Sequence, residues 1–308
     1  MITNSYQNTA LIDSDYIIWI AANRNKVYEH GIPKMEDKKF VYTDKTVEEA
    51  KATCDLYMND ILNLVRADSY ILCLTTGQTF RAKFDNSYKA NRAGMERPMW
   101  FNEIKQHMKD EWGAIEKIGL EADDMVCIIK NELTNCFIVA ADKDVVDCTE
   151  GKHFDARRGR VAWLETTKEQ ADMNFAISML TGDAVDGIAH LEKGMGPKTA
   201  EELIRLRVEM NLISPISAAF NIFLQKLGEV EGVKRFYNQY RLLKMITSLK
   251  ELPEGIDFEI PEPLCYHCVE TILSQDFYDL YYEPENNDTT GGGTTSDSTL
   301  PGSKDPIL

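Results

Sequence analysis

The sequence predicts an α/β fold in which helices flank a mostly parallel β-sheet. Three short apolar runs, at residues 9–13, 70–74 and 136–140, have the length and composition of buried strands. Stretches with helical spacing of apolar residues separate these runs, and this alternation is typical of a parallel sheet covered by helices. In such folds the ligand site lies beyond the carboxyl ends of the strands.

The first half of the chain supplies most of these elements. Thr9–Asp13 is predicted to be the first strand, with Asp13 at its tip and a second apolar run, Tyr16–Ala22, behind it. A capping box, Thr46-Val-Glu-Glu49, then opens a helix. The buried strand Tyr70–Leu74 follows this helix.

The pattern changes near residue 165. Before that point, a one-sided apolar pattern predicts a helix over Ala122–Leu133, which leads into the strand Cys136–Ala140. A second capping box, Thr166-Thr-Lys-Glu169, begins a pattern that stays helical to about Ser248, whereas residues 286–303 are almost without apolar side chains. We therefore expect an α/β core over residues 1–165, a helical region over 166–283 and a flexible tail over 284–308.

The composition is that of a globular protein, and the net charge bears on which partners the chain can bind. Of its 308 residues, 44% are apolar, and 34 Lys and Arg stand against 50 Asp and Glu, which gives a net charge of −16. Such a balance argues against a generic polyanion binder. No apolar run approaches the length of a membrane span, no signal peptide is recognisable, and the 7 scattered cysteines suggest reduced thiols. We expect a cytoplasmic protein, or one in the host cytoplasm if a phage encodes it.

The acidic residues gather at the ends of the predicted elements. They form four groups: Asp13 with Asp15, Glu121 with Asp123 and Asp124, Asp142 with Asp144, and Asp183 with Asp186. In a parallel sheet the first and third groups meet at one rim, where like charges are tolerable chiefly when cations neutralise them. Oxygen ligands without His or Cys favour Mg²⁺ or Mn²⁺. The alternative for each single acid is helix capping.

Two further segments suit phosphate binding. From Arg81 to Lys109 the chain holds seven basic and three acidic residues among several aromatic ones, a mixture that contacts phosphates and stacks on bases. The segment Gly194-Met-Gly196-Pro-Lys198-Thr-Ala200 places two glycines and a lysine ahead of a helix, where backbone N–H groups can meet a phosphate. The alternatives are a solvated basic helix face and an ordinary turn between helices.

Taken in order along the chain, these segments resemble the flap-endonuclease-type 5′→3′ exonucleases, and especially the stand-alone bacteriophage enzymes, over about residues 9–250. The resemblance implies a PIN-like nuclease core with a helical arch at about 85–109 and a helix-three-turn-helix element at about 183–205. It implies catalytic roles for Asp13, Lys89 and Arg92. The metal ligands that it implies are Asp13, Glu121, Asp123, Asp124, Asp142, Asp144, Asp183 and Asp186. The DNA contacts that it implies are Arg81, Lys83, Tyr88, Lys89, Arg92, Gly194, Gly196, Lys198 and Thr199.

The function implied is metal-dependent hydrolysis of DNA at a 5′ end or a 5′ flap, during replication, primer removal or repair. It would use two Mg²⁺ ions, which Mn²⁺ can replace, and a K⁺ ion at the helix-three-turn-helix element. RNA in RNA–DNA hybrids is a further candidate substrate, replication proteins are candidate partners, and a monomer is expected. The chain departs from the family pattern at Thr76, where related phage enzymes have an acid, and in the spacing between Asp186 and Gly194.

Two other functions compete with this one. Asp13-Ser-Asp15 together with Gly182-Asp-Ala-Val-Asp186 also resembles the first and last motifs of haloacid-dehalogenase-type phosphatases. That scheme leaves the basic segment and the glycine turn unexplained. The third candidate is a non-catalytic DNA-binding protein, which Thr76 in place of an acid would suit.

Overall fold

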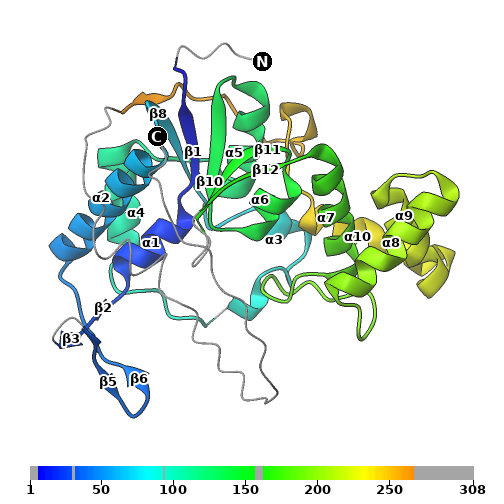
Figure 1. Cartoon of the computed structure of the whole chain (residues 1–308), viewed down its shortest axis with the longest axis horizontal. Coiled ribbons are helices and arrows are strands. Elements are labelled where there is room, and N and C mark those ends of the chain that lie inside the picture. Colours follow the sequence, from blue (N-terminus) through cyan, green and yellow to red (C-terminus); the bar gives the residue numbers. More distant parts are fainter. Residues whose placement is uncertain (1–5, 30–31, 93, 157–161, 267–308) are drawn as a thin grey trace, which may run out of the picture.

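A mostly parallel sheet forms the centre of the molecule, as the sequence predicts. The computed structural model describes residues 6–29, 32–92, 94–156 and 162–266 (Figure 1). The strands lie in the order β12-β11-β10-β1-β8-β13, and β9 also pairs with β8. The parallel strands are β1 (Thr9–Asp13), β8 (Ser69–Leu74), β9 (Ile115–Glu116), β10 (Cys136–Ala140) and β11 (Gly151–Asp155). Two edge strands, β12 (Ala162–Thr166) and β13 (Leu264–Cys265), run antiparallel.

Helices cover both faces of this sheet, because alternate residues of each strand point to opposite faces. On β1, Ile12 packs with α1 (Asp15–Ala22), α2 (Val47–Leu64) and α4 (Phe101–Trp112). Its neighbour Leu11 packs on the other side. That side is covered by α5 (Ala122–Glu132) and α6 (Lys143–Cys148).

A second helical body stands beside the sheet, to the right in Figure 1. It consists of α7 (Lys168–Thr181), α8 (Pro197–Asn211), α9 (Pro215–Leu227) and α10 (Glu229–Leu243), which enclose their own apolar core. The chain then returns to the sheet through η2 (Leu249–Glu251) and β13. None of the helices in the described ranges is both long and apolar enough to cross a membrane.

Several local predictions are confirmed and others need correction. The capping box at Thr46 and Glu49 is present. The second box is shifted by one residue, to Thr167 and Gln170, because Thr166 is still paired in β12. The apolar run Tyr16–Ala22 belongs to helix α1. The flexible tail expected over 284–308 lies outside the described residues.

Two regions differ from the simple predicted outline. An arch was expected over residues 85–109. The first part of this range contains the short helix η1 (Ala90–Arg92), and residues 101–109 belong to α4. Ile104 and Met108 of α4 are buried in the core with α1 and α2. Between α1 and α2, three small antiparallel ribbons that we did not predict project from the core (Figure 1). They pair β2 (Asn25–Lys26) with β7 (Tyr42–Thr43), β3 (Tyr28–Glu29) with β4 (Ile32–Pro33), and β5 (Met35–Glu36) with β6 (Lys39–Phe40).

Candidate functional site

An open cleft at the carboxyl ends of the central strands gathers acidic side chains from three elements and a helix cap. Asp13 ends β1, Asp15 begins α1, Asp123 lies in the first turn of α5, and Asp142 caps the N-terminus of α6. These four carboxylates and Glu121 line a cavity of about 590 Å³, which we call the carboxylate cleft. The cleft lies where a parallel sheet is expected to bind its ligand.

Burial and neighbouring negative charges raise the pKa of acidic side chains in the cleft. Burial, followed by the charges of Asp15 and Asp142, raises the pKa of Asp13 to about 8. Burial and the charges of Asp13 and Asp142 likewise raise the pKa of Asp123 well above its usual value. Within the described residues no lysine or arginine forms an ion pair with Asp13, Asp15, Asp123 or Asp142. The positive charges of Lys89 and Lys105 act on Asp15, and that of Lys89 on Asp123, without direct contact, and they do not offset the effect of burial on either pKa.

Two of the three basic side chains that line the same cleft, Lys89 and Arg92, are held by other acids. Lys89 donates to Oε1 of Glu121 at 2.7 Å, and Arg92 donates to Oδ1 of Asp186. Although burial raises the pKa of Glu121, the charges of Arg81 and Lys89 bring it below the usual value. The structure thus brings Lys89 and Arg92 to the cleft, where each is paired with a predicted metal ligand.

Arg81 is an exception to the predicted DNA contacts. Its side chain is 2% exposed, so it is not available to a nucleic acid. Its guanidinium donates to both oxygens of Asp124, at 2.6 and 2.8 Å, and to Glu121 at 2.8 Å. The remaining donors bond the carbonyls of Leu242 and Lys244, at the end of α10. Arg81 therefore ties the helical body to the acids behind the cleft.

The same contacts correct the role predicted for Asp124. Its carboxylate is fully buried, its two oxygens accept from Arg81, and Oδ1 also accepts from the N–H of Ile246 at 2.9 Å. A carboxylate engaged in this way is not free to bind a cation. The acid at this position of the motif is thus a buried partner of Arg81.

Tyr88 is also buried, and its ring is not available for stacking on a base. Its hydroxyl donates to Glu121 at 3.0 Å and lies 3.2 Å from Asp186, so it links the core to the turn after α7. Lys83, on the short helix α3 (Phe80–Phe84), remains exposed.

The other three predicted ligands do not line the carboxylate cleft. Asp183 accepts from the N–H groups of Val185 and Asp186 and organises the turn after α7, while Lys143 lies 3.6 Å away. Asp186 pairs with Lys89 and Arg92. Asp144 borders a separate small cavity of about 60 Å³.

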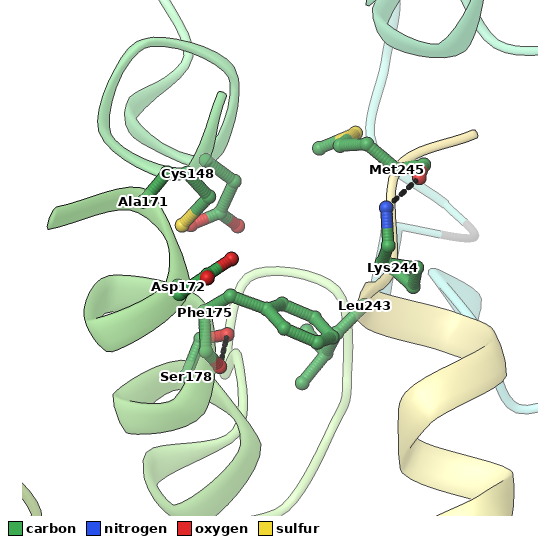
Figure 2. A pocket seen from close by; sticks show the side chains of 9 residues that line it. Cys148, Ala171, Asp172, Phe175, Ser178, Leu243, Lys244 and Met245 are labelled. Carbon is green, nitrogen blue, oxygen red and sulfur yellow. Dashed lines mark hydrogen bonds between the residues drawn. The ribbon is translucent and has the colours of Figure 1, made fainter. Parts of the chain in front are cut away.

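Figure 2 shows that small cavity between α6, α7 and the end of α10. The ammonium of Lys244 is directed at the carbonyl of Met245, and the Ser178 hydroxyl bonds the Phe175 carbonyl of its own helix. Burial and the charge of Asp142 raise the pKa of Asp144 to about 7. These contacts are internal to the fold.

The expected convergence of eight acids is therefore only partial. As the side chains stand, no three His, Cys, Asp or Glu residues in the described ranges are arranged so that they could hold a metal ion. Three of the predicted ligands, Glu121, Asp124 and Asp186, are instead paired with Arg81, Lys89 or Arg92.

The predicted glycine turn presents an exposed backbone at the start of α8. Gly196 is the N-cap and Pro197 the first helical residue, while Lys198 and Thr199 are exposed in the first turn. A Cβ added at Gly194 or Gly196 would meet nothing within 4 Å. The N–H groups of Met195 and Gly196 bond carbonyls of the turn itself and Pro197 has none, so the N–H groups of the first helical turn at Lys198 and Thr199 are the ones that face an anion.

The sequence placed three residues of the cleft in a charged group or an apolar run, without marking them as site residues. Asp15 accepts from the N–H of Thr75 at 3.0 Å and faces the same cavity as Asp13, and its spacing of two residues from Asp13 was the available signal. Trp19 and Arg97 also line the cleft. Arg97 was predicted only as one of the seven basic residues after Gly77 and Trp19 only as part of an apolar run, because the loop and the helix that carry them meet only in the folded chain.

Comparisons with known proteins agree with this geometry. Residues 30–176 match the family profile described as the 5′-3′ exonuclease, N-terminal resolvase-like domain. A comparison with curated protein sequences gives no match. Nothing in these findings supports the phosphatase alternative.

One solved nuclease structure has the same fold, and a second gives a lower score. A complex of the bacteriophage T5 D15 flap endonuclease with DNA and metal ions is 15% identical, with a TM-score of 0.50 over 78% of this chain and 90% of that chain. The catalytic core of Rad2 with a DNA substrate is 12% identical, with a TM-score of 0.47 over 90% of this chain and 88% of that chain. The chain therefore resembles the 5′-3′ exonucleases over residues 30–176 and has the fold of the bacteriophage T5 D15 flap endonuclease.

Proposed function

We propose that the chain hydrolyses DNA phosphodiesters at 5′ ends and 5′ flaps with the help of divalent cations. One observation carries this proposal: Asp13, Asp15, Asp123 and Asp142 line one open cleft without a basic partner among the described residues, across from Lys89 and Arg92. The four carboxylates are suited to bind divalent cations, and the two basic side chains are suited to bind the phosphate that these cations would activate.

The donor set fits hard cations. All four side chains offer carboxylate oxygens, burial raises the pKa of Asp13 and Asp123, and a bound divalent ion would remove that penalty. We propose that Asp13, Asp123 and Asp142 hold two Mg²⁺ ions with help from Asp15, and that Mn²⁺ can replace them. When bound, these ions would supply an activated water and neutralise charge on the leaving oxygen.

Lys89 and Arg92 would act on the phosphate itself. Each is held at the cleft by one carboxylate, Glu121 for Lys89 and Asp186 for Arg92. These acids keep the two cations pointed at the cleft before substrate arrives, which is the preorganisation that electrostatic catalysis needs. In this scheme Glu121 and Asp186 position basic groups, Asp183 shapes the turn that carries Asp186, and the N–H of Asp144 holds the carboxylate of Asp142.

The exposed start of α8 would hold the duplex next to the cleft. The backbone N–H groups and side chains of Lys198 and Thr199, in the first turn of α8, can bind a backbone phosphate. We further propose that a K⁺ ion binds at this turn, that Lys83 contacts the strand near the cleft, and that RNA in RNA–DNA hybrids is also accepted. Primer removal or repair alongside replication proteins would be the setting.

One assay tests the proposal directly. A nicked duplex and a 5′-flap duplex, labelled at either end, are incubated with Mg²⁺, Mn²⁺ or EDTA. We expect products released from the 5′ side, only with a divalent cation. Asp142→Asn should abolish cleavage but retain DNA binding, whereas the matched surface change Asp257→Asn, which removes an exposed pair with Lys117, should leave activity unchanged.

The same assay separates the remaining alternative. DNA binding in Mg²⁺ without cleavage of any substrate would indicate a non-catalytic DNA-binding protein, the role that Thr76 in the cleft would suit. Full Mg²⁺-dependent activity of Asp142→Asn would show that the cation site lies elsewhere.

A further inference from the structure

We propose that a second cavity next to the carboxylate cleft binds a nucleobase of the single-stranded 5′ end of the DNA substrate. This cavity, which we call the aromatic pocket, lies between residues 19–24, 44–45 and 96–100 and has a volume of about 580 Å³. The inference rests on the proposed function and adds to it a binding site for one class of ligand, a nucleotide of a displaced 5′ strand.

The aromatic pocket is continuous with the carboxylate cleft. Trp19 and Arg97 line both cavities, so they form the wall that the two share. A strand whose phosphate lies at Lys89 and Arg92 would therefore reach the aromatic pocket with its next nucleotides. Both cavities fall within the range of about 300–1,000 Å³ that is usual for small-ligand sites.

The walls of the aromatic pocket suit a base. Trp19 is 40% exposed, although it is a large apolar residue. Its ring meets Phe101 edge-on, with centroids 5.4 Å apart, and the guanidinium of Arg97 lies 4.8 Å from the centre of the same Phe101 ring. Indole rings and guanidinium planes are the groups on which bases stack. Phe101 thus anchors both stacking groups on α4.

The opposite wall is fixed by hydrogen bonds. The indole Nε1 of Trp100 donates to the carbonyl of Lys45 at 2.7 Å, and the ammonium of Lys45 bonds the carbonyl of Ala21 at 3.2 Å. These contacts join the loop before α4 to the segment before α2 and to the end of α1. Because the walls are held in place, a base would enter a pocket that is already formed.

The charge of the aromatic pocket favours a single nucleotide. Arg24, Lys45 and Arg97 face Asp44 and Glu96 around it, and Arg24 is paired with Asp44 at 2.9 Å. Arg97 forms no ion pair within the described residues and is exposed. One such cation suits one phosphate next to a stacked base, whereas a duplex would need several.

The experiment compares three substrates that differ only in the 5′ strand: a nicked duplex, a duplex with a one-nucleotide 5′ flap, and the same flap with an abasic site. Affinity is measured with Ca²⁺ in place of Mg²⁺. The flap base is also replaced by 2-aminopurine, whose fluorescence falls on stacking. The native protein should bind the base-bearing flap roughly tenfold more tightly than the abasic one.

Two variants test the wall itself. Trp19→Ala should remove both the preference for the base and the loss of fluorescence, and Trp19→Phe should restore part of each. Trp163→Ala is the matched control, because Trp163 is 41% exposed and also meets aromatic rings edge-on, but lies on the edge strand β12. It should behave as the native protein does.

The outcomes separate the two proposals. Equal affinity for base-bearing and abasic flaps, or an equal loss for both in Trp19→Ala, would overturn the aromatic pocket while leaving the nuclease intact. If native protein neither bound nor cut any of the three substrates, the proposed function would fail, and this inference with it.

Discussion

Arg81 offers the sharpest test of how the cleft is built. Five hydrogen bonds leave its guanidinium, to Glu121, to both oxygens of Asp124, and to the carbonyls of Leu242 and Lys244. An arginine has five N–H donors in a planar fork, whereas a lysine has three on a single nitrogen. Arg81→Lys therefore loses at least two of these bonds in a buried site.

The loss of stability can be worked from those contacts. With about 1.5 kcal/mol for each hydrogen bond to a charged group, Arg81→Lys should lower the free energy of unfolding by about 3 kcal/mol. Arg81→Met also leaves Asp124 buried without its counter-charge and should cost about 3–5 kcal/mol. For Arg81→Lys the melting temperature should fall by roughly 6–12 °C.

Urea unfolding followed by circular dichroism measures these differences. The control is Arg205→Lys, because Arg205 is paired with Glu201 on the surface and is 58% exposed; it should change stability by less than about 0.5 kcal/mol. In the double variant Arg81→Met with Asp124→Leu, the buried pair is replaced as a whole. It should be destabilised by at least about 1 kcal/mol less than the sum of the single variants.

Two results would refute this reasoning. If Arg81→Lys were as stable as the native protein, the planar fork would not be needed. If the double variant showed strictly additive losses, Arg81 and Asp124 would not depend on each other.

Three further predictions concern the cleft and the turn after α7. Lys89→Gln should lower kcat by about two orders of magnitude while changing duplex affinity much less; a defect in affinity alone, measured by titration, would count against its role at the phosphate. The pKa of Asp13 is raised to about 8 in the folded protein, so the folded protein without metal holds the proton of this carboxyl more tightly than the unfolded chain does. The free energy of unfolding should therefore fall as the pH rises from about 4 to 8. Melting curves in EDTA at pH 5.5 and 8 measure this dependence of stability on pH. Mg²⁺ should reduce the dependence, and so should Asp13→Asn. If Asp13→Asn showed the same dependence as the native protein, this carboxyl would not be its source. Gly182→Ala should destabilise by more than about 2 kcal/mol, since its φ is +64° and a Cβ would lie 2.4 Å from the Ile188 carbonyl oxygen. Gly194→Ala, at a φ of +86° but with open space around it, should cost only about 1 kcal/mol. If thermal unfolding showed the same loss of stability for Gly182→Ala and Gly194→Ala, the clash of the added Cβ at Gly182 would not be the cause of its loss.

Local sequence signals predicted the three central strands of the sheet, β10, β1 and β8, but not β9, β11, β12 or β13. The strands at Thr9–Asp13 and Cys136–Ala140 match their predicted bounds, because a run of buried residues between polar ends is a local property. The run Tyr16–Ala22 gave no clear period and proved to be helical. The ribbons between α1 and α2 had no signal at all, since each strand there has only two residues.

The placement of acids at the ends of strands and helices followed from the sequence alone, as did the mixture of basic and aromatic residues after Gly77. The tertiary structure decided which basic side chain pairs with which acidic one. Arg81 pairs with Glu121 and Asp124 across 40 and 43 residues, and Arg92 pairs with Asp186 across 94. These distances in sequence leave no local pattern, because an ion pair depends only on separation in space and on exclusion of water. For this reason the sequence could indicate a cluster of carboxylates, but only the fold could divide it into acids left for cations and acids already paired with arginine and lysine.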